Sequence, residues 1–161
     1  LSRYLNPLSL DEAKLKQSDH SIEFNKDSHV LSELSVEGFI EKDFVVVPIH
    51  STLRTLVDAV AHSKRNIFPV VDEQGNLAGI IALENIREIM FDTSLYDSLS
   101  VNQLMQKPIV TANLSDDMSL IMEKFDKSGV WNIPVVSDGK YIGFISKSSV
   151  FTNYRDRLRQ E

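Results

Sequence analysis

Two stretches with the same pattern of apolar and polar positions divide the chain into similar halves. Residues 66–81 and 131–145 each contain an apolar run with a proline, a polar turn with a glycine, and a returning apolar run. Apolar runs rich in Val and Ile on both sides of a short turn predict a β-hairpin. Each returning run contains a glycine, Gly79 or Gly143. A glycine inside a strand predicts that another backbone approaches closely at that point.

The similarity extends beyond the hairpins. A shift of 65 positions aligns Pro69-Val70-Val71 with Pro134-Val135-Val136, and a shift of 64 aligns Gly79 with Gly143. Residues 52–63 and 116–127 both have apolar positions at the i, i+3, i+4, i+7 spacing of one helix face. The sequence therefore predicts two copies of one supersecondary unit.

Both copies are expected to contain the same elements in the same order. The predicted ranges are helical turns at 36–40 and 101–105, strands at 44–47 and 109–111, helices at 52–63 and 116–127, and closing helices at 83–91 and 147–158. Ser51 or Thr52 is expected to cap the first long helix, and Asp116 and Asp117 favour the start of the second.

This order predicts an α+β fold in which each copy has the arrangement β-α-β-β-α. A unit of about 60 residues has a marginal core by itself. We therefore expect the two copies to pack sheet to sheet about a pseudo-twofold axis. The expected division is a linker or lead-in at 1–35, with a short helix at 8–16, a first repeat at 36–95 and a second at 96–161.

Composition narrows the function classes. The net charge of −6 argues against a nucleic-acid partner. The absence of cysteine excludes disulfides, thiolate zinc sites and cysteine nucleophiles. No apolar stretch approaches the roughly 20 residues that span a bilayer. Because the first residue is Leu1, we expect the chain to be a piece of a longer protein or a processed product.

Four motifs resemble the tandem CBS domain, named after cystathionine β-synthase: residues 101–105, residues 109–111, the two Pro-Val-Val hairpins, and the glycine-apolar-apolar stretch before each closing helix. The resemblance covers about residues 36–155. It implies a regulatory module, not an enzyme, with no catalytic residues. It also implies an adenosine-nucleotide cleft between the copies and a homodimer formed through the helices of two pairs.

The family's ribose motif is a Ser or Thr three residues after the hairpin glycine and an Asp three residues later. Ala82 and Asn85 stand at these places in the first copy, and Ser146 and Ser149 in the second. Both aspartates are therefore missing. The amide oxygen of Asn85 can still accept a hydrogen bond, but the charge-assisted bonds of a carboxylate are lost.

The resemblance also implies which residues line the cleft. They are Val45, Val46, Ile67, Phe68, Ala82, Asn85, Val110, Thr111, Asn132, Ile133, Ser146 and Ser149. Two interpretations stay open. The residues form a site for ATP, ADP or AMP as a regulatory ligand, with no cofactor required, or they are ordinary sheet residues that close an empty groove.

A narrower resemblance concerns residues 63–71, 85–91 and 143–155, which look like the cytoplasmic tail of bacterial CLC-type chloride channels and transporters. It implies a soluble region on the cytoplasmic side of the cell membrane, in one chain with a membrane-embedded channel domain. The alternatives are a dimerisation scaffold without ligand, or the CBS pair of another transporter or of a nucleotide-pathway enzyme.

The remaining candidates have two interpretations each. Trp131 either stacks on a purine or packs at the hairpin entrance. Lys64 and Arg65 either meet phosphates or form a solvated helix end, and the arginines of 155–159 either face solvent or contact a dimer partner or lipid headgroups.

Asp72 and Asp138 are expected in turns. The four histidines have no metal-ligand spacing, so no metal site is predicted.

Overall fold

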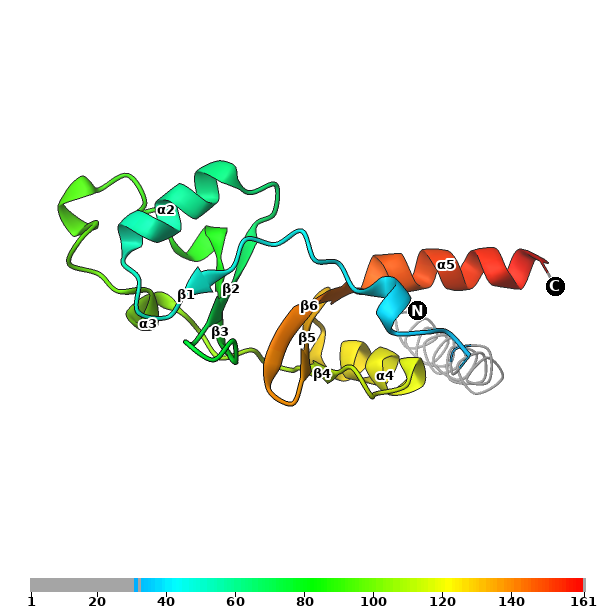
Figure 1. Cartoon of the computed structure of the whole chain (residues 1–161). Helices are drawn as coiled ribbons and strands as arrows, with labels where there is room; N and C mark the ends of the chain where they lie inside the picture. Colours follow the sequence, from blue (N-terminus) through cyan, green and yellow to red (C-terminus); the bar gives the residue numbers. More distant parts are fainter. Residues whose placement is uncertain (1–30, 32, 161) are drawn as a thin grey trace, which may run out of the picture.

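The computed structural model describes residue 31 and residues 33–160 (Figure 1). The helix predicted at 8–16 and most of the predicted linker lie outside the described residues. In chain order, the elements are the 3-10 helix η1 (Glu37–Phe39), β1 (Val47–Pro48), α2 (Leu53–His62), β2 (Ile67–Val71), β3 (Leu77–Ala82), η2 (Leu83–Asn85), η3 (Thr93–Leu95), α3 (Val101–Leu104), β4 (Ala112–Asn113), α4 (Met118–Ser128), β5 (Asn132–Ser137), β6 (Lys140–Ser146) and α5 (Lys147–Gln160).

The strands form two three-stranded mixed sheets with the same topology, β1-β2-β3 and β4-β5-β6. In each sheet the first strand is parallel to the second, and the second is antiparallel to the third. Even the registers correspond, because Val70 pairs with Gly79 and Val135 with Gly143, with a register shift at the next residue in both hairpins. The predicted α+β fold of two repeats is confirmed.

A hydrophobic core lies between the sheet and the long helix of each repeat, and the other repeat contributes to it, because Val36 packs in the second core and Val101 in the first. Leu53 and Leu56 of α2 have no exposed surface, and Met118, Ile121 and Phe125 of α4 are equally buried. These are the apolar positions that the helical spacing predicted. In Figure 1 the two sheets face each other in the middle of the molecule, and the helices lie on the outer sides.

The helix caps follow the prediction only in the second repeat. Asp117 caps α4, since its Oδ1 accepts a hydrogen bond from the Leu120 N–H at 2.8 Å. At the start of α2, Thr52 occupies the cap position without a side-chain bond to the helix, and the Ser51 hydroxyl donates instead to the Pro48 carbonyl. The predicted capping by Ser51 or Thr52 is therefore wrong.

The first strands are shorter and later than predicted. Parallel pairing begins at Val47, opposite Val70, so residues 44–46 precede β1. Residues 109–111 likewise precede β4. The apolar character of this segment has another cause in the first repeat, because Phe44 packs its ring against Phe144 with centroids 4.4 Å apart.

The predicted helix at 83–91 is also wrong. Only η2 forms, and hydrogen-bonded turns follow it up to residue 91. The second repeat shows the physical reason. There the Ser146 hydroxyl accepts a hydrogen bond from the Ser149 N–H at 3.1 Å, and α5 continues for 14 residues. Ala82 occupies the matching place before η2 and has no oxygen with which to cap a helix.

The repeats are joined by two reciprocal crossings. Glu41, just before the first repeat's sheet, pairs antiparallel with Phe144 of β6, through backbone hydrogen bonds of 2.8 and 3.0 Å. Gln106, at the matching position in the second repeat, pairs antiparallel with Ile80 of β3 at 2.8 and 2.9 Å. In each repeat, a residue that precedes the first strand thus pairs with the last strand of the other repeat.

Two glycines permit these crossings. A Cβ atom on Gly143 would lie 2.6 Å from both the Glu41 carbonyl oxygen and Ile40 Cγ2. A Cβ on Gly79 would lie 2.8 Å from Met105 Sδ and 2.9 Å from the Gln106 carbonyl oxygen. The close backbone approach predicted at both glycines is confirmed.

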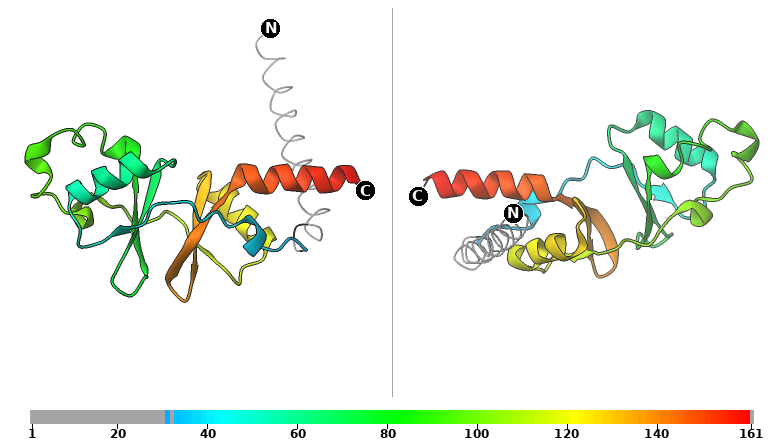
Figure 2. Two further views of the ribbon diagram at one scale, coloured as in Figure 1. Left: turned by 45° about the horizontal axis from the view of Figure 1, so that its top comes forward. Right: turned by 180° about the vertical axis from the view of Figure 1, so that it is seen from behind.

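The hairpin tips form a third contact between the repeats. The Leu77 N–H donates to the Gly139 carbonyl and the Tyr141 N–H to the Gly75 carbonyl, both at 3.0 Å. Figure 2 shows the two hairpins projecting side by side in the same direction. Both turn glycines have positive φ angles, +84° at Gly75 and +80° at Gly139. Asp72 accepts hydrogen bonds from the Gln74 and Asn76 N–H groups within its turn, as predicted for a turn residue.

We expect Gly143→Ala to lower the free energy of unfolding by about 1–3 kcal/mol, because the new methyl group would collide with the crossing backbone. Gly38→Ala is the matched control, since a Cβ atom at residue 38 would meet nothing within 4 Å. Thermal melting of both variants against the unsubstituted chain measures the difference. Equal midpoints for the two variants would show that the crossing tolerates a side chain.

Candidate functional site

An open pocket of about 270 Å³ lies where β2 begins and β3 ends. Its lining consists of Asn66, Ile67, Ala82, Leu83, Glu84 and Arg87. The backbone shapes the corner between the sheet and η2 at which the pocket lies. The Leu83 N–H donates to the Asn66 carbonyl at 2.8 Å, and Ile67 pairs with Ala82 across the hairpin. The pocket therefore sits at the junction of sheet and η2 in the first repeat.

The pocket has an apolar wall and a polar mouth. Ile67, Ala82 and Leu83 supply the apolar surface, whereas Glu84 and Arg87 are exposed charged residues. Within the described part of the chain, neither charge has an ion-pair partner. A guanidinium with free donors is suited to a phosphate group. The volume is just below the usual range of small-molecule sites, about 300–1,000 Å³, so it suits part of a mononucleotide.

Of the cleft residues predicted in the first repeat, two line this pocket. They are Ile67 and Ala82. Asn85 is exposed at the end of η2 and is not among the lining residues. Val46 is 41% exposed, whereas Val45 and Phe68 pack in or against the first core, where Phe68 has no exposed surface.

In the second repeat, three predicted residues lie together at the matching corner. Asn132 pairs with Ser146 across the hairpin, and Ser146 caps α5 through the Ser149 N–H. The Ser146 hydroxyl thus has a structural role at the helix start.

Of the other three predicted residues of the second repeat, Ile133 and Val110 pack in or against its core, and Thr111 is half-buried. Ile133 has no exposed surface, and Val110 packs against the same core. The Thr111 carbonyl accepts a hydrogen bond from Lys124 Nζ at 2.9 Å, and Lys124 also forms a 2.8 Å ion pair with Asp116. Asp116 thus supports its helix through Lys124 and through the Asn113 N–H.

Sequence reasoning missed the pocket's polar mouth. Asn66 and Leu83 are the immediate neighbours of the predicted Ile67 and Ala82, and Arg87 follows Leu83 by four positions. Arg87 lies in the turns after η2 and not in a helix, so its place at the pocket mouth could be found only from the structure.

Arg65 is held at the junction of the two repeats. Its guanidinium forms two hydrogen bonds with Asp43, at 2.9 and 2.8 Å, and an ion pair with Glu41 at 3.0 Å. It also lies over the Phe44 ring, 4.7 Å from the centroid. Arg65 is thus neither a solvated helix end nor free to meet a phosphate. The hydrogen bond to Arg65 lowers the pKa of Asp43, and the same bond raises the pKa of Arg65.

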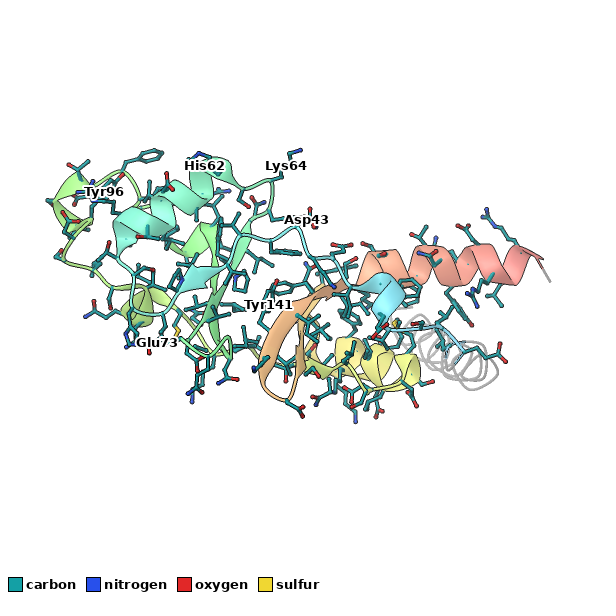
Figure 3. All side chains as sticks on the ribbon, in the orientation of Figure 1. Asp43, His62, Lys64, Glu73, Tyr96 and Tyr141 are labelled. Atoms are coloured by element: carbon teal, nitrogen blue, oxygen red, sulfur yellow. The ribbon has the colours of Figure 1, made fainter. Side chains whose placement is uncertain are left out.

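Tyr141 lies at the same junction, between the two repeats in Figure 3. Its hydroxyl is buried and has no hydrogen-bond partner among the described residues. Burial raises the pKa of this hydroxyl, and the charge of Asp43 raises it further. Its ring packs edge-on against Phe144, with centroids 5.9 Å apart.

Other site classes find no support in the described residues. Residues 31 and 33–160 contain no group of three or more His, Asp or Glu side chains that could hold a metal ion. In that same part of the chain, no helix combines the length and apolar character needed to cross a membrane.

Comparison with known proteins identifies both repeats. The family model described as "CBS domain" matches residues 36–92 and again residues 101–156. A homoserine O-acetyltransferase of Methanococcus vannielii is 26% identical over 124 residues, which cover 76% of this chain and 25% of that protein. The chloride channel protein CLC-f of Arabidopsis thaliana is 24% identical over 175 residues, which cover 95% of this chain and 22% of that protein.

Among solved structures, CbpB in complex with c-di-AMP has the same fold, with a TM-score of 0.67 and 16% identity. The similarity covers 86% of this chain and 95% of that one. The chain spans about a quarter of the length of the two curated relatives, which are an enzyme and a channel.

We expect Tyr141→Phe to leave the free energy of unfolding unchanged or to raise it, because the buried hydroxyl has no partner to lose among the described residues. Tyr96→Phe is the control, since the Tyr96 hydroxyl donates to the Met90 carbonyl at 2.7 Å. That change should cost about 0.5–1.5 kcal/mol in chemical denaturation.

The raised pKa of Tyr141 adds a pH dependence to this comparison. The folded state keeps the hydroxyl neutral, whereas the unfolded chain ionises it near its ordinary value of about 10. The contribution of Tyr141 is therefore fully present below that value and is lost as the pH rises towards the folded pKa. The free energy of unfolding should therefore fall less between about pH 8 and pH 11 in Tyr141→Phe than in Tyr96→Phe, because the latter variant still contains Tyr141. Identical losses would contradict the burial of Tyr141.

Proposed function

The chain belongs to the CBS domain family, and we propose that it is a regulatory module that binds an adenosine nucleotide in the pocket of its first repeat. The observation that carries this proposal is the open pocket with Ile67 and Ala82 on its wall and, at its mouth, Arg87, which has no ion-pair partner among the described residues. The c-di-AMP complex of a protein with the same fold supports the ligand class. We further propose that the module acts by binding and has no catalytic activity of its own.

In this proposal the base packs against Ile67 and Leu83, and Arg87 holds the phosphates. Asn66 offers an amide that can donate and accept hydrogen bonds. The missing carboxylate at Asn85 would weaken recognition of the ribose, and the charge of Arg87 would compensate at the phosphate end. Glu84, at the same mouth, would disfavour ligands with a large negative charge, so AMP or ADP suits the site better than ATP.

Regulation would follow from a population shift. A ligand changes an equilibrium only by its difference in affinity for the two arrangements. Ala82 at the pocket and Ile80 at the crossing with Gln106 lie two residues apart on β3. A ligand held at Ala82 would therefore favour one arrangement of the repeats over another.

A homodimer is the proposed assembly, formed through the helices. Its support is apolar surface on the outer elements, because Phe91 after η2 is 81% exposed, Leu120 on α4 is 41% exposed and Leu158 on α5 is 38% exposed. The same surface supports a second candidate function, a scaffold that dimerises its parent without a ligand.

We propose that the parent protein is a CLC-type chloride channel or transporter, with this module on the cytoplasmic side. The support is the match to CLC-f, which extends over 95% of this chain, beyond the two repeats. The alternative is that the parent protein is an enzyme, and its support is the match to a homoserine O-acetyltransferase, which covers 76% of this chain.

Thermal melting with millimolar AMP, ADP and ATP tests the nucleotide site. At 100 times its dissociation constant a ligand adds about 2.7 kcal/mol, which should raise the midpoint by several degrees. Arg87→Gln should weaken binding roughly 10- to 100-fold, the usual effect of one charged hydrogen bond. Arg155→Gln, at an exposed position of α5, is the matched control and should bind normally. Unchanged melting of a folded, dimeric chain would leave the scaffold function.

The coding sequence upstream of Leu1 tests the parentage. A CLC-type parent requires several stretches of about 20 apolar residues before this module. The measurement is a full-length transcript, followed by chloride flux of the whole protein in vesicles. A soluble catalytic domain in that position would contradict the channel assignment and support an enzyme.

A further inference from the structure

The two repeats exchange the segments that precede their sheets. Val36 belongs to the first repeat but is buried in the second core, and Val101 belongs to the second repeat but is buried in the first core. Leu31 and Leu34 are buried in the second core as well. Each exchanged segment ends where its backbone pairs with the last strand of the other repeat. The chain then returns to its own sheet through a short linker.

The two linkers occupy equivalent places in the fold. The first linker, residues 42–46, follows Glu41 and leads to β1. The second linker, residues 107–111, follows Gln106 and leads to β4. A change in the angle between the repeats would bend these linkers. The contacts that fasten each linker therefore decide how freely the repeats can move.

Arg65 fastens the first linker to both repeats. It lies just before β2 of the first repeat, and its guanidinium binds Asp43 of the linker at 2.8 and 2.9 Å and Glu41 at 3.0 Å. Glu41 is itself paired with Phe144 of the second repeat. The Phe44 ring contacts both Arg65 and Phe144, with 4.7 Å from the guanidinium to the ring centroid and 4.4 Å between the two centroids. A side chain of the first repeat thus reaches the last strand of the second through this linker.

The second linker lacks this fastening. A shift of 65 positions puts Val130 in the place of Arg65 and Pro108 in the place of its aspartate partner, so that no ion pair can form there. Ile109, in the place of the aromatic ring, is 79% exposed. Among the described residues, no ion pair, hydrogen bond or ring contact joins residues 107–111 to the first repeat. The junction is therefore held by charge at one linker and not at the other.

The arginine that fastens the first linker also adjoins the pocket. The next two residues, Asn66 and Ile67, line the pocket. The Ser63 hydroxyl holds the Arg65 backbone, because it accepts from the Arg65 N–H at 2.9 Å and donates to the Arg65 carbonyl at 3.0 Å. A displacement of Arg65 would therefore move the pocket wall. The pocket is open in the arrangement in which Arg65 is paired, so a ligand held there should favour that arrangement.

We propose that Arg65, Asp43 and Glu41 form a clasp between the repeats, and that Arg65 is the positioning residue that couples occupancy of the pocket to the angle between them. Because only one linker is fastened, the closed clasp selects one arrangement, and its release permits a range of arrangements. Coupling between two sites is reciprocal, so removal of the clasp weakens the ligand that favours it. The coupling rests on the proposed function, whereas the clasp does not.

Distances between two spin labels measure the clasp directly. The chain has no cysteine, so Ala61→Cys on α2 and Thr152→Cys on α5, both at exposed positions, put one label on each repeat. With the clasp intact, the distance distribution should be narrow. Arg65→Gln should broaden it, because the repeats are then free to change their angle.

Arg54→Gln is the matched control. Arg54 forms the same kind of two-bond pair with Asp97, at 2.9 and 3.0 Å, and lies over the Tyr96 ring, which packs against the first core. Its loss touches neither linker, so the distribution should stay narrow. Asp43→Asn should broaden the distribution as Arg65→Gln does, and it keeps the test decisive if Arg65→Gln does not fold. Unchanged widths in both clasp variants, or equal broadening by the control, would overturn the clasp.

Isothermal titration with AMP tests the coupling. Arg65→Gln should weaken binding roughly 5- to 150-fold, the usual range of coupling between sites, and Arg54→Gln should bind normally. Asp43→Asn, whose residue does not line the pocket, should weaken binding by a similar factor. The double variant should be no weaker than either single variant, because both remove the same clasp. Weaker binding by Arg65→Gln alone would show a direct contact with the ligand and would overturn the coupling.

The outcomes separate this inference from the proposed function. Normal AMP binding by both clasp variants would retain the nucleotide site and overturn the coupling. Absence of AMP binding in the unsubstituted chain, together with a broadened distribution in Arg65→Gln, would retain the clasp and overturn both the nucleotide site and its coupling.

Discussion

The reciprocal crossing of backbones at two glycines is the constraint on which the arrangement of the molecule depends. Glu41 pairs with Phe144, and Gln106 pairs with Ile80. Both contacts require a neighbouring residue without a side chain, because a Cβ on Gly143 would lie 2.6 Å from the passing backbone. Each repeat is a small unit whose core also takes in a residue of the other repeat, Val36 in the second core and Val101 in the first. The crossings turn two such units into one body and define which surfaces face each other.

The pseudo-twofold arrangement does not make the two repeats chemically equivalent. An open pocket lies beside Arg87 in the first repeat, whereas at the aligned positions of the second repeat Lys147 contacts the rings of Trp131 and Phe151. The junction is asymmetric as well, because Arg65 binds Asp43 and Glu41 beside Phe44, whereas Val130 and Pro108 stand at the places that match Arg65 and Asp43. A duplicated fold can thus carry different side-chain contacts at equivalent places of its two copies.

Much of the fold could be predicted because its signals are local. The hairpins, α2, α4 and α5 follow from apolar spacing and turn residues. Because the sequence repeats, an element predicted in one repeat supported the prediction of the matching element in the other. Two predictions failed where a single residue or a distant segment outweighed the local apolar pattern. The helix at 83–91 does not form beyond η2, since Ala82 cannot cap it. The strand at 44–47 begins only at Val47, and Phe44 before it packs on Phe144 of the other repeat.

The sequence by itself determined the doubled topology, the burial of the helix faces and the close approach at both glycines, since each depends on residues near one another in the chain. It also indicated Ile67 and Ala82. Tertiary structure alone decided that Arg65 is paired, that the buried Tyr141 hydroxyl has no partner among the described residues, and that a pocket opens beside Arg87. The side chains at each corner come from segments about 20 positions apart. Their contacts depend on how strand, turn and helix meet, which no local pattern records.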